Sequence, residues 1–101
     1  MAGVLGISGI KIQKYVNTNA SAGSLSIFSG VTKGIVFITF NQSMAGHQNV
    51  IGFVRDANNI SLNAFNAGSE AAYQTLTISS GVVTLANAGY GIGQFTAYWI
   101  S

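Results

Sequence analysis

The 101-residue chain contains no cysteine. This absence excludes a disulfide framework and any metal site built from thiolates. Burial of apolar surface must therefore offset the conformational entropy that folding removes. At this length we expect a single domain over residues 1–101, in which residues 1–23 form an N-terminal strand and a loop leading into the main body.

Charged residues are scarce, at 6% of the chain, against roughly a quarter in ordinary domains. Four scattered cations make no stripe that could follow phosphates, so nucleic acid is not an expected partner. Ser, Thr, Asn and Gln fill the polar positions, and such a surface responds little to salt or pH because few of its groups titrate or are screened. It also lacks the repulsion that keeps proteins monomeric, which suits a component of a particle.

Long apolar runs are missing as well. The longest such stretches are about six residues, against the roughly 20 that a membrane-spanning helix needs. The sequence therefore predicts no membrane insertion.

Side chains able to carry chemistry are few. His47 is the only histidine, and Asp56 and Glu70 are the only carboxylates. No nucleophile-elbow motif accompanies them, which argues against a Ser–His–Asp triad. Arg55 adjoins Asp56 in a sequence typical of a hairpin tip, which argues against a catalytic carboxylate pair. One histidine and two carboxylates also make a poor metal site. The glycine cluster "GYGIG" precedes a strand and opens no helix, so it indicates a turn. We expect no enzyme, no cofactor and no bound metal.

The apolar residues that are present follow a period of two, with no sustained helical pattern. β-Branched and aromatic residues fill the runs, and Gly, Asn and Ser separate them. The sequence predicts an all-β, antiparallel β-sandwich, jelly-roll-like, of about eight short strands, with "NAGSEAAY" the best place for one helical turn. The expected strands are "GIKIQKYV", "SLSIFSG", "GIVFITF", "NVIGFVRD", "ISLNAF", "QTLTIS", "VVTLAN" and "GQFTAYWIS".

Alternation also predicts which side chains point inward in the simpler strands. These are Leu25 and Ile27 in the second run, with Phe28 on the opposite face, and Ile60, Leu62 and Ala64 in the fifth.

Three runs, 35–40, 50–54 and 95–100, are apolar on both faces. The outer face of a two-layer sandwich is normally solvated, so something must cover these runs. A symmetry mate is the simplest cover, and it makes the last run a central strand within an oligomer. The alternatives are that one sheet curls over its neighbour or that the outward aromatics are scattered singly. The predicted interface residues are Phe37, Phe53, Tyr98 and Ile100.

Aromatic and amide side chains gather in or near the expected loops, and Tyr15 lies near a loop edge too. Their ring faces, donors and acceptors suit neutral sugars, and equally suit adaptable protein-binding surfaces. Packing is the alternative role for each residue taken singly. The candidate ligand-binding residues are His47, Gln48, Asn66, Tyr73 and Tyr90.

The order of these patterns over residues 24–101 resembles the C-terminal tip domains of tailed-phage tail fibres and related receptor-binding proteins. "SLSIFSGVTKGIVFITF" has their apolar strand, polar kink, Lys-Gly and second apolar strand. "GYGIGQFTAYWIS" has their glycine-rich turn and closing aromatic strand. The resemblance implies a small trimeric sandwich in the virion that binds a bacterial surface polysaccharide or outer surface protein. Only about 20 residues precede the pattern, so we expect an excised head domain or a small standalone virion protein.

Three candidate functions follow. The first is a non-enzymatic phage adhesin that binds its receptor as a homotrimer. The second is a structural virion subunit, such as a capsid decoration, head fibre or filament protein, with protein–protein contacts only. A cellular lectin-like module is the third.

Overall fold

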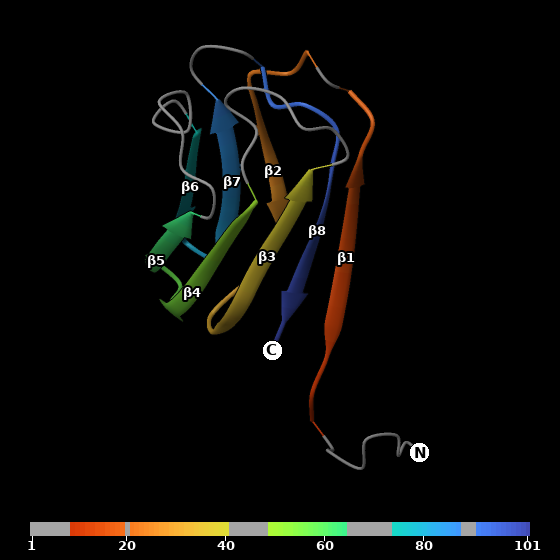
Figure 1. Cartoon of the computed structure of the whole chain (residues 1–101). Helices are drawn as coiled ribbons and strands as arrows, with labels where there is room; N and C mark the ends of the chain where they lie inside the picture. Colours follow the sequence, from red (N-terminus) through yellow and green to blue (C-terminus); the bar gives the residue numbers. More distant parts are fainter. Residues whose placement is uncertain (1–8, 20, 41–48, 65–73, 88–90) are drawn as a thin grey trace.

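The computed structural model describes residues 9–19, 21–40, 49–64, 74–87 and 91–101 (Figure 1). These residues form eight antiparallel strands in two sheets and no helix, which confirms the predicted β-sandwich. The segment "NAGSEAAY" lies outside the described residues. The strands are β1 (Ile12–Asn17), β2 (Ser24–Phe28), β3 (Gly34–Phe40), β4 (Val50–Asp56), β5 (Asn59–Ala64), β6 (Gln74–Ser79), β7 (Val82–Asn87) and β8 (Phe95–Ile100).

The larger sheet has five strands in the order β1-β8-β3-β4-β5, and the smaller has three in the order β2-β7-β6. The last strand therefore lies inside the larger sheet, between β1 and β3, as the sequence predicts. This pairing of the first strands with the last ones, β1 with β8 and β2 with β7, gives the sandwich its jelly-roll-like character.

The core lies between the two sheets and follows the predicted alternation. In β8, Phe95, Ala97 and Trp99 are buried, while the alternate residues Thr96, Tyr98 and Ile100 are half-buried. Ile60 packs against the core, and the side chains of Leu62 and Ala64 lie outside the described part. Other fully buried side chains are Val31, Val36, Ile38, Val50, Val83, Leu85 and Ile92.

The predicted outward position of Phe28 is wrong. The register of β2 against β7 shifts between Ser26 and Phe28, so strict alternation ends there. The bulge turns Phe28 into the core beside Ile27, where its ring lies 6.0 Å from that of Trp99. Two consecutive buried residues thus stand where the sequence pattern predicts one.

The Lys33-Gly34 step joins the two sheets close to Trp99. The indole Nε1 of Trp99 donates a hydrogen bond to the Lys33 carbonyl at 2.9 Å. Gly34 has φ of 113°, and a Cβ there would collide with the backbone carbonyl of Ile100. Only glycine is compatible with this close approach of β3 to β8.

Successive strands run up and down without exception, so the connections divide between two ends (Figure 1). The end that holds Ser101 has the short connections, residues 29–33, 57–58 and 80–81. They are joined in series, because Val31 N donates to Gly81 O at 2.9 Å and Gly81 N donates to Ala57 O at 2.8 Å. Backbone hydrogen bonds therefore hold the three short connections together at this end.

Candidate binding surfaces

The opposite end carries the long connections and is called the loop end here, defined as residues 18–23, 41–49, 65–73 and 88–94. The predicted ligand-binding residues His47, Gln48, Asn66, Tyr73 and Tyr90 lie outside the described residues. The strands that flank them are described, however, and each of the three segments leaves and re-enters the sandwich at this end. The strand ends that flank these three segments therefore share one end of the sandwich.

Buried amide side chains form the floor of the loop end. Asn17, Gln74 and Asn87 are each less than a tenth exposed and lie at the loop-end termini of β1, β6 and β7. The Asn17 side chain donates to Gly93 O at 2.7 Å and accepts from Asn19 N at 3.1 Å. Sequence reasoning missed this layer, although an Asn or Gln at an inward position beside a loop is its signal.

Backbone contacts hold the base of the loop end together. Ile92 N donates to Ala22 O at 2.7 Å, and Asn87 N donates to Gly23 O at 3.1 Å. Phe40 N donates to the Asn49 side chain at 3.1 Å across the ends of one long connection. The loops thus start from fixed positions on a rigid scaffold, an arrangement common in recognition surfaces.

Tyr15, near a loop edge in sequence, does not belong to this surface. Its ring is half-buried on the inner side of β1 and stacks on Phe95 with centroids 6.1 Å apart. This tyrosine packs against the core.

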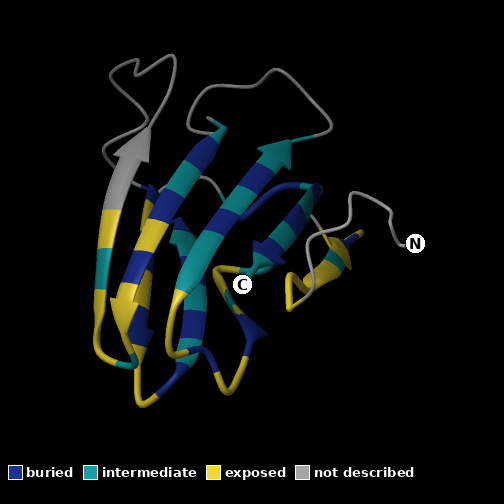
Figure 2. Ribbon diagram, turned by 90° about the horizontal axis from the view of Figure 1, so that it is seen from below, coloured by how far each residue is buried: buried dark blue, intermediate teal, exposed yellow. Residues whose placement is uncertain are grey.

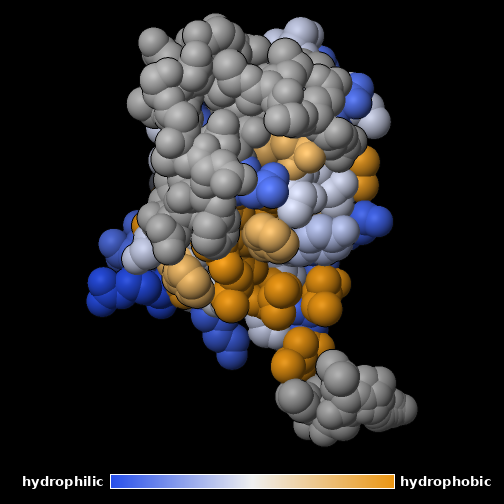
Figure 3. Space-filling view, in the orientation of Figure 1, coloured by the Kyte–Doolittle hydropathy of each residue, from blue (hydrophilic) through white to orange (hydrophobic). Residues whose placement is uncertain are grey.

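The second candidate surface is the outer side of the larger sheet. Here the structure brings together all four predicted interface residues. Phe37 is opposite Tyr98, and Ile35 is opposite both Ile100 and Phe53. Apolar side chains gather over the lower parts of β1, β8, β3 and β4 in Figure 3. We call this the apolar sheet face: Ile12, Val16, Ile35, Phe37, Ile51, Phe53, Tyr98 and Ile100.

Half of this face was not named from the sequence. The unnamed half is Ile12, Val16, Ile35 and Ile51, and of these Ile12 is 64% exposed and Val16 53%. β1 stands out in Figure 2 as the strand near the N label that is mostly coloured exposed. The register of Ile12 against Ile100 places it on the face, and this long-range pairing cannot be read from local sequence.

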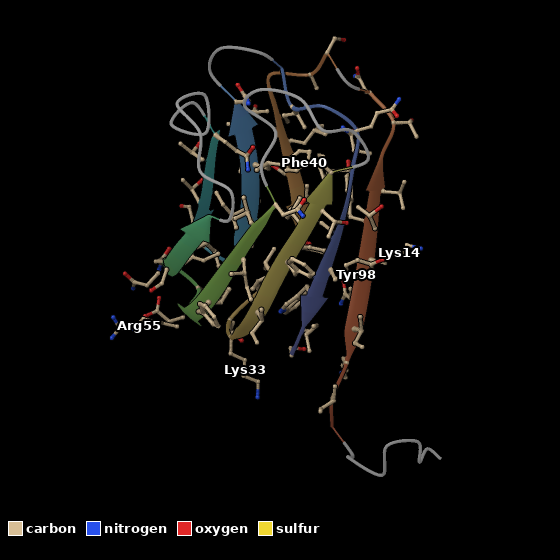
Figure 4. The ribbon with its side chains drawn as sticks, viewed as in Figure 1. Lys14, Lys33, Phe40, Arg55 and Tyr98 are labelled. Carbon is tan, nitrogen blue, oxygen red and sulfur yellow. The ribbon has the colours of Figure 1, made fainter. Side chains whose placement is uncertain are left out.

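Cations mark the border of the apolar sheet face. Figure 4 shows Lys14 at the β1 side, Lys33 below β3 and Arg55 beyond the lower end of β4. Asp56, next to Arg55, accepts hydrogen bonds from Asn58 N at 2.8 Å and from the Asn59 side chain at 2.8 and 2.9 Å. These bonds, with a smaller contribution from Arg55, hold the pKa of Asp56 below its usual value.

The outer side of the smaller sheet is different. Its outward positions carry mainly hydroxyl groups, and Ser26, Thr84 and Thr77 stand in one row across the three strands. The hydroxyl groups of Ser26 and Thr84 form a hydrogen bond with an oxygen–oxygen distance of 3.4 Å. One sheet of the sandwich thus presents the polar outer face expected in water, and the other does not.

Within the described ranges, no three His, Cys, Asp or Glu side chains gather to hold a metal ion, and no buried side-chain nitrogen or oxygen lacks a partner. No helix in these ranges is long and apolar enough to cross a membrane. The chain matches no family model, no curated protein and no solved structure.

Proposed function

We propose that the chain is a non-enzymatic receptor-binding domain of a bacteriophage particle, acting as a homotrimeric adhesin. Its loop end recognises a bacterial surface polysaccharide or outer surface protein. The observation that carries the proposal is the division of connections between the two ends. The strand ends that flank the long connections share one end, and both described termini lie toward the other (Figure 1). The five candidate ligand residues fall within these connections in the sequence.

The side-chain chemistry of the loop end supports a neutral ligand. The candidates include two tyrosines and two amides, which stack on sugar rings and bond to hydroxyls. Of the two carboxylates, Asp56 lies at the opposite end, where it is engaged within the β4–β5 hairpin; Glu70 and His47 fall in the loop-end segments, outside the described residues. Asp56 is therefore too far from the candidates to act with them, and the amides and aromatic rings supply the chemistry of the proposed site.

The test combines replacements at two loop-end tyrosines. Labelled wild-type chain is incubated with a panel of bacterial cells and with polysaccharides purified from those that bind. Tyr73→Ala with Tyr90→Ala should weaken binding at least tenfold, because the sugar-stacking rings are gone. Thr77→Ala, exposed on the smaller sheet, should bind as the wild type does.

Two results would count against the proposal. Unchanged binding by the double variant removes both tyrosines from the site. A chain that ignores every cell and polysaccharide but joins other virion proteins favours the structural subunit instead, for which the apolar sheet face supplies a protein–protein surface.

A further inference from the structure

We infer that the apolar sheet face is the contact between copies of this chain. The inference rests on the homo-oligomer in the proposed function, and it names the surface that forms it. Its centre is aromatic, with Phe37 and Tyr98 directly opposite each other on β3 and β8 and Phe53 one strand further on β4. Ile12 and Ile100 extend it to the edge strand.

The contrast between the two outer faces is the first argument. Both belong to antiparallel sheets of one sandwich, so solvent alone would select hydroxyl-rich positions on both. Thr75, Thr77 and Ser79 on β6 follow this rule. Ile51 and Phe53 on β4 break it, and Ile12 is 64% exposed in a single copy. Burial of this face against another apolar surface would therefore be favourable.

The size and composition of the face are the second argument. Four adjacent strands and two or three same-face positions along each give a flat area of about 300 Å². Apolar patches of about 300–600 Å² on single proteins are often functional, and a stable contact covers about 800 Å² per partner. The apolar sheet face therefore has the dimensions of an interface centre, with Lys14, Thr39 and Thr96 in the polar rim around it.

Charge identifies the occupant. Lys14 shares the outer side of the edge strand β1, opposite Tyr98, but the face residues on β8, β3 and β4 carry no charged side chain. The centre of the face therefore offers nothing to a strongly acidic or basic partner. A second copy presents the same uncharged, apolar centre. Aromatic side chains with few charges are typical of the centre of protein interfaces.

Pairing through the open edge of β1 is the competing mode of assembly. Among the described strands β1 has only β8 as a neighbour, so its other edge faces no described strand. Lys14 lies in this strand and Lys11 directly precedes it, however, and lysines at an edge strand oppose such pairing. Phe53 lies three strands away from that edge, so its replacement distinguishes the two modes.

Sedimentation of the purified chain at about 100 μM tests the inference. We expect the wild type to sediment as a multiple of 10.5 kDa, and Phe53→Lys to sediment as a single copy, with a dissociation constant raised at least a hundredfold. Thr77→Lys, the same change in charge at an exposed strand position of the other sheet, should keep the wild-type mass. Circular dichroism confirms that each variant is folded.

Ile12→Ser is a second variant of the apolar sheet face, and it should barely affect the core because Ile12 is exposed. If Phe53→Lys does not fold, a lower mass of Ile12→Ser tests the same inference. A wild type of 10.5 kDa overturns the inference. So does a wild-type mass that survives in both face variants. An oligomer of wild-type mass that binds no cells would count against the adhesin function but not against the proposed contact. The two proposals can therefore be tested separately.

Discussion

At the scale of the single residue, Trp99 shows how the last strand is held within the sandwich. Its indole is buried between the sheets against Phe28, and its Nε1 holds the Lys33 carbonyl at 2.9 Å. It therefore fixes β8 to the start of β3 by packing and by a hydrogen bond.

Trp99→Ala should lower the free energy of unfolding by about 3–5 kcal/mol, because it removes a large buried side chain and leaves a cavity. Denaturation in urea at one fixed protein concentration, followed by circular dichroism, measures the change. Trp99→Phe keeps much of the packing but leaves the Lys33 carbonyl without its indole donor, so its loss should be smaller, about 1–3 kcal/mol. Equal stability of wild type and Trp99→Ala would contradict the buried position.

Single residues also show where sequence reasoning succeeds and where it stops. Trp99 follows the alternation of its own strand, so its burial was predictable. Phe28 was placed on the wrong face because a bulge, set by the partner strand β7, adds a residue. Tyr15 looked available for ligands, but its neighbour Phe95 comes from the far end of the chain.

At the scale of the element, the eight strands were predictable because alternation and turn residues are local signals. Their neighbours were not, since the β1–β8 ladder joins Ile12 to Ile100 and no local pattern encodes it. The shared end of the long connections follows only once the pairing is known. For the same reason the interface was predicted on β3, β4 and β8, while the contribution of β1 was missed.

The stability of the β4–β5 hairpin should depend on pH through Asp56. Hydrogen bonds from Asn58 and Asn59, and the nearby Arg55, lower the pKa of Asp56 below 3.8 in the folded chain. The ionised carboxylate therefore stabilises the fold above that pH, and this stabilisation is lost as the pH falls through the folded-state pKa.

Asp56→Asn keeps an acceptor at the hairpin but cannot ionise. The wild type should melt at a higher temperature than Asp56→Asn at pH 7, and the gap should narrow as the pH falls below about 4. Groups that titrate in both proteins cancel in this difference. A gap that stays constant down to pH 2 would show that the charge of Asp56 does not support the hairpin.

At the scale of the whole molecule, the scarcity of charge is consistent with the different outer faces of the two sheets. The chain has six formally charged side chains other than histidine, and only four of them are cations. The sandwich is held by apolar burial and backbone pairing, the smaller sheet meets water with hydroxyl groups, and the larger sheet presents apolar side chains. Ion pairs have little part in either the fold or the proposed assembly.

The mass of the assembly should therefore be independent of ionic strength. Between about 0.05 and 1 M sodium chloride the Debye length falls from about 14 to 3 Å, which screens surface charges but leaves apolar burial in place. Light scattering should report the same mass throughout. Sodium sulfate should strengthen the assembly, because excluded salts favour burial of apolar surface. Dissociation in 1 M sodium chloride would instead identify Lys14, Arg55 or Asp56 at the rim as the groups that join the copies.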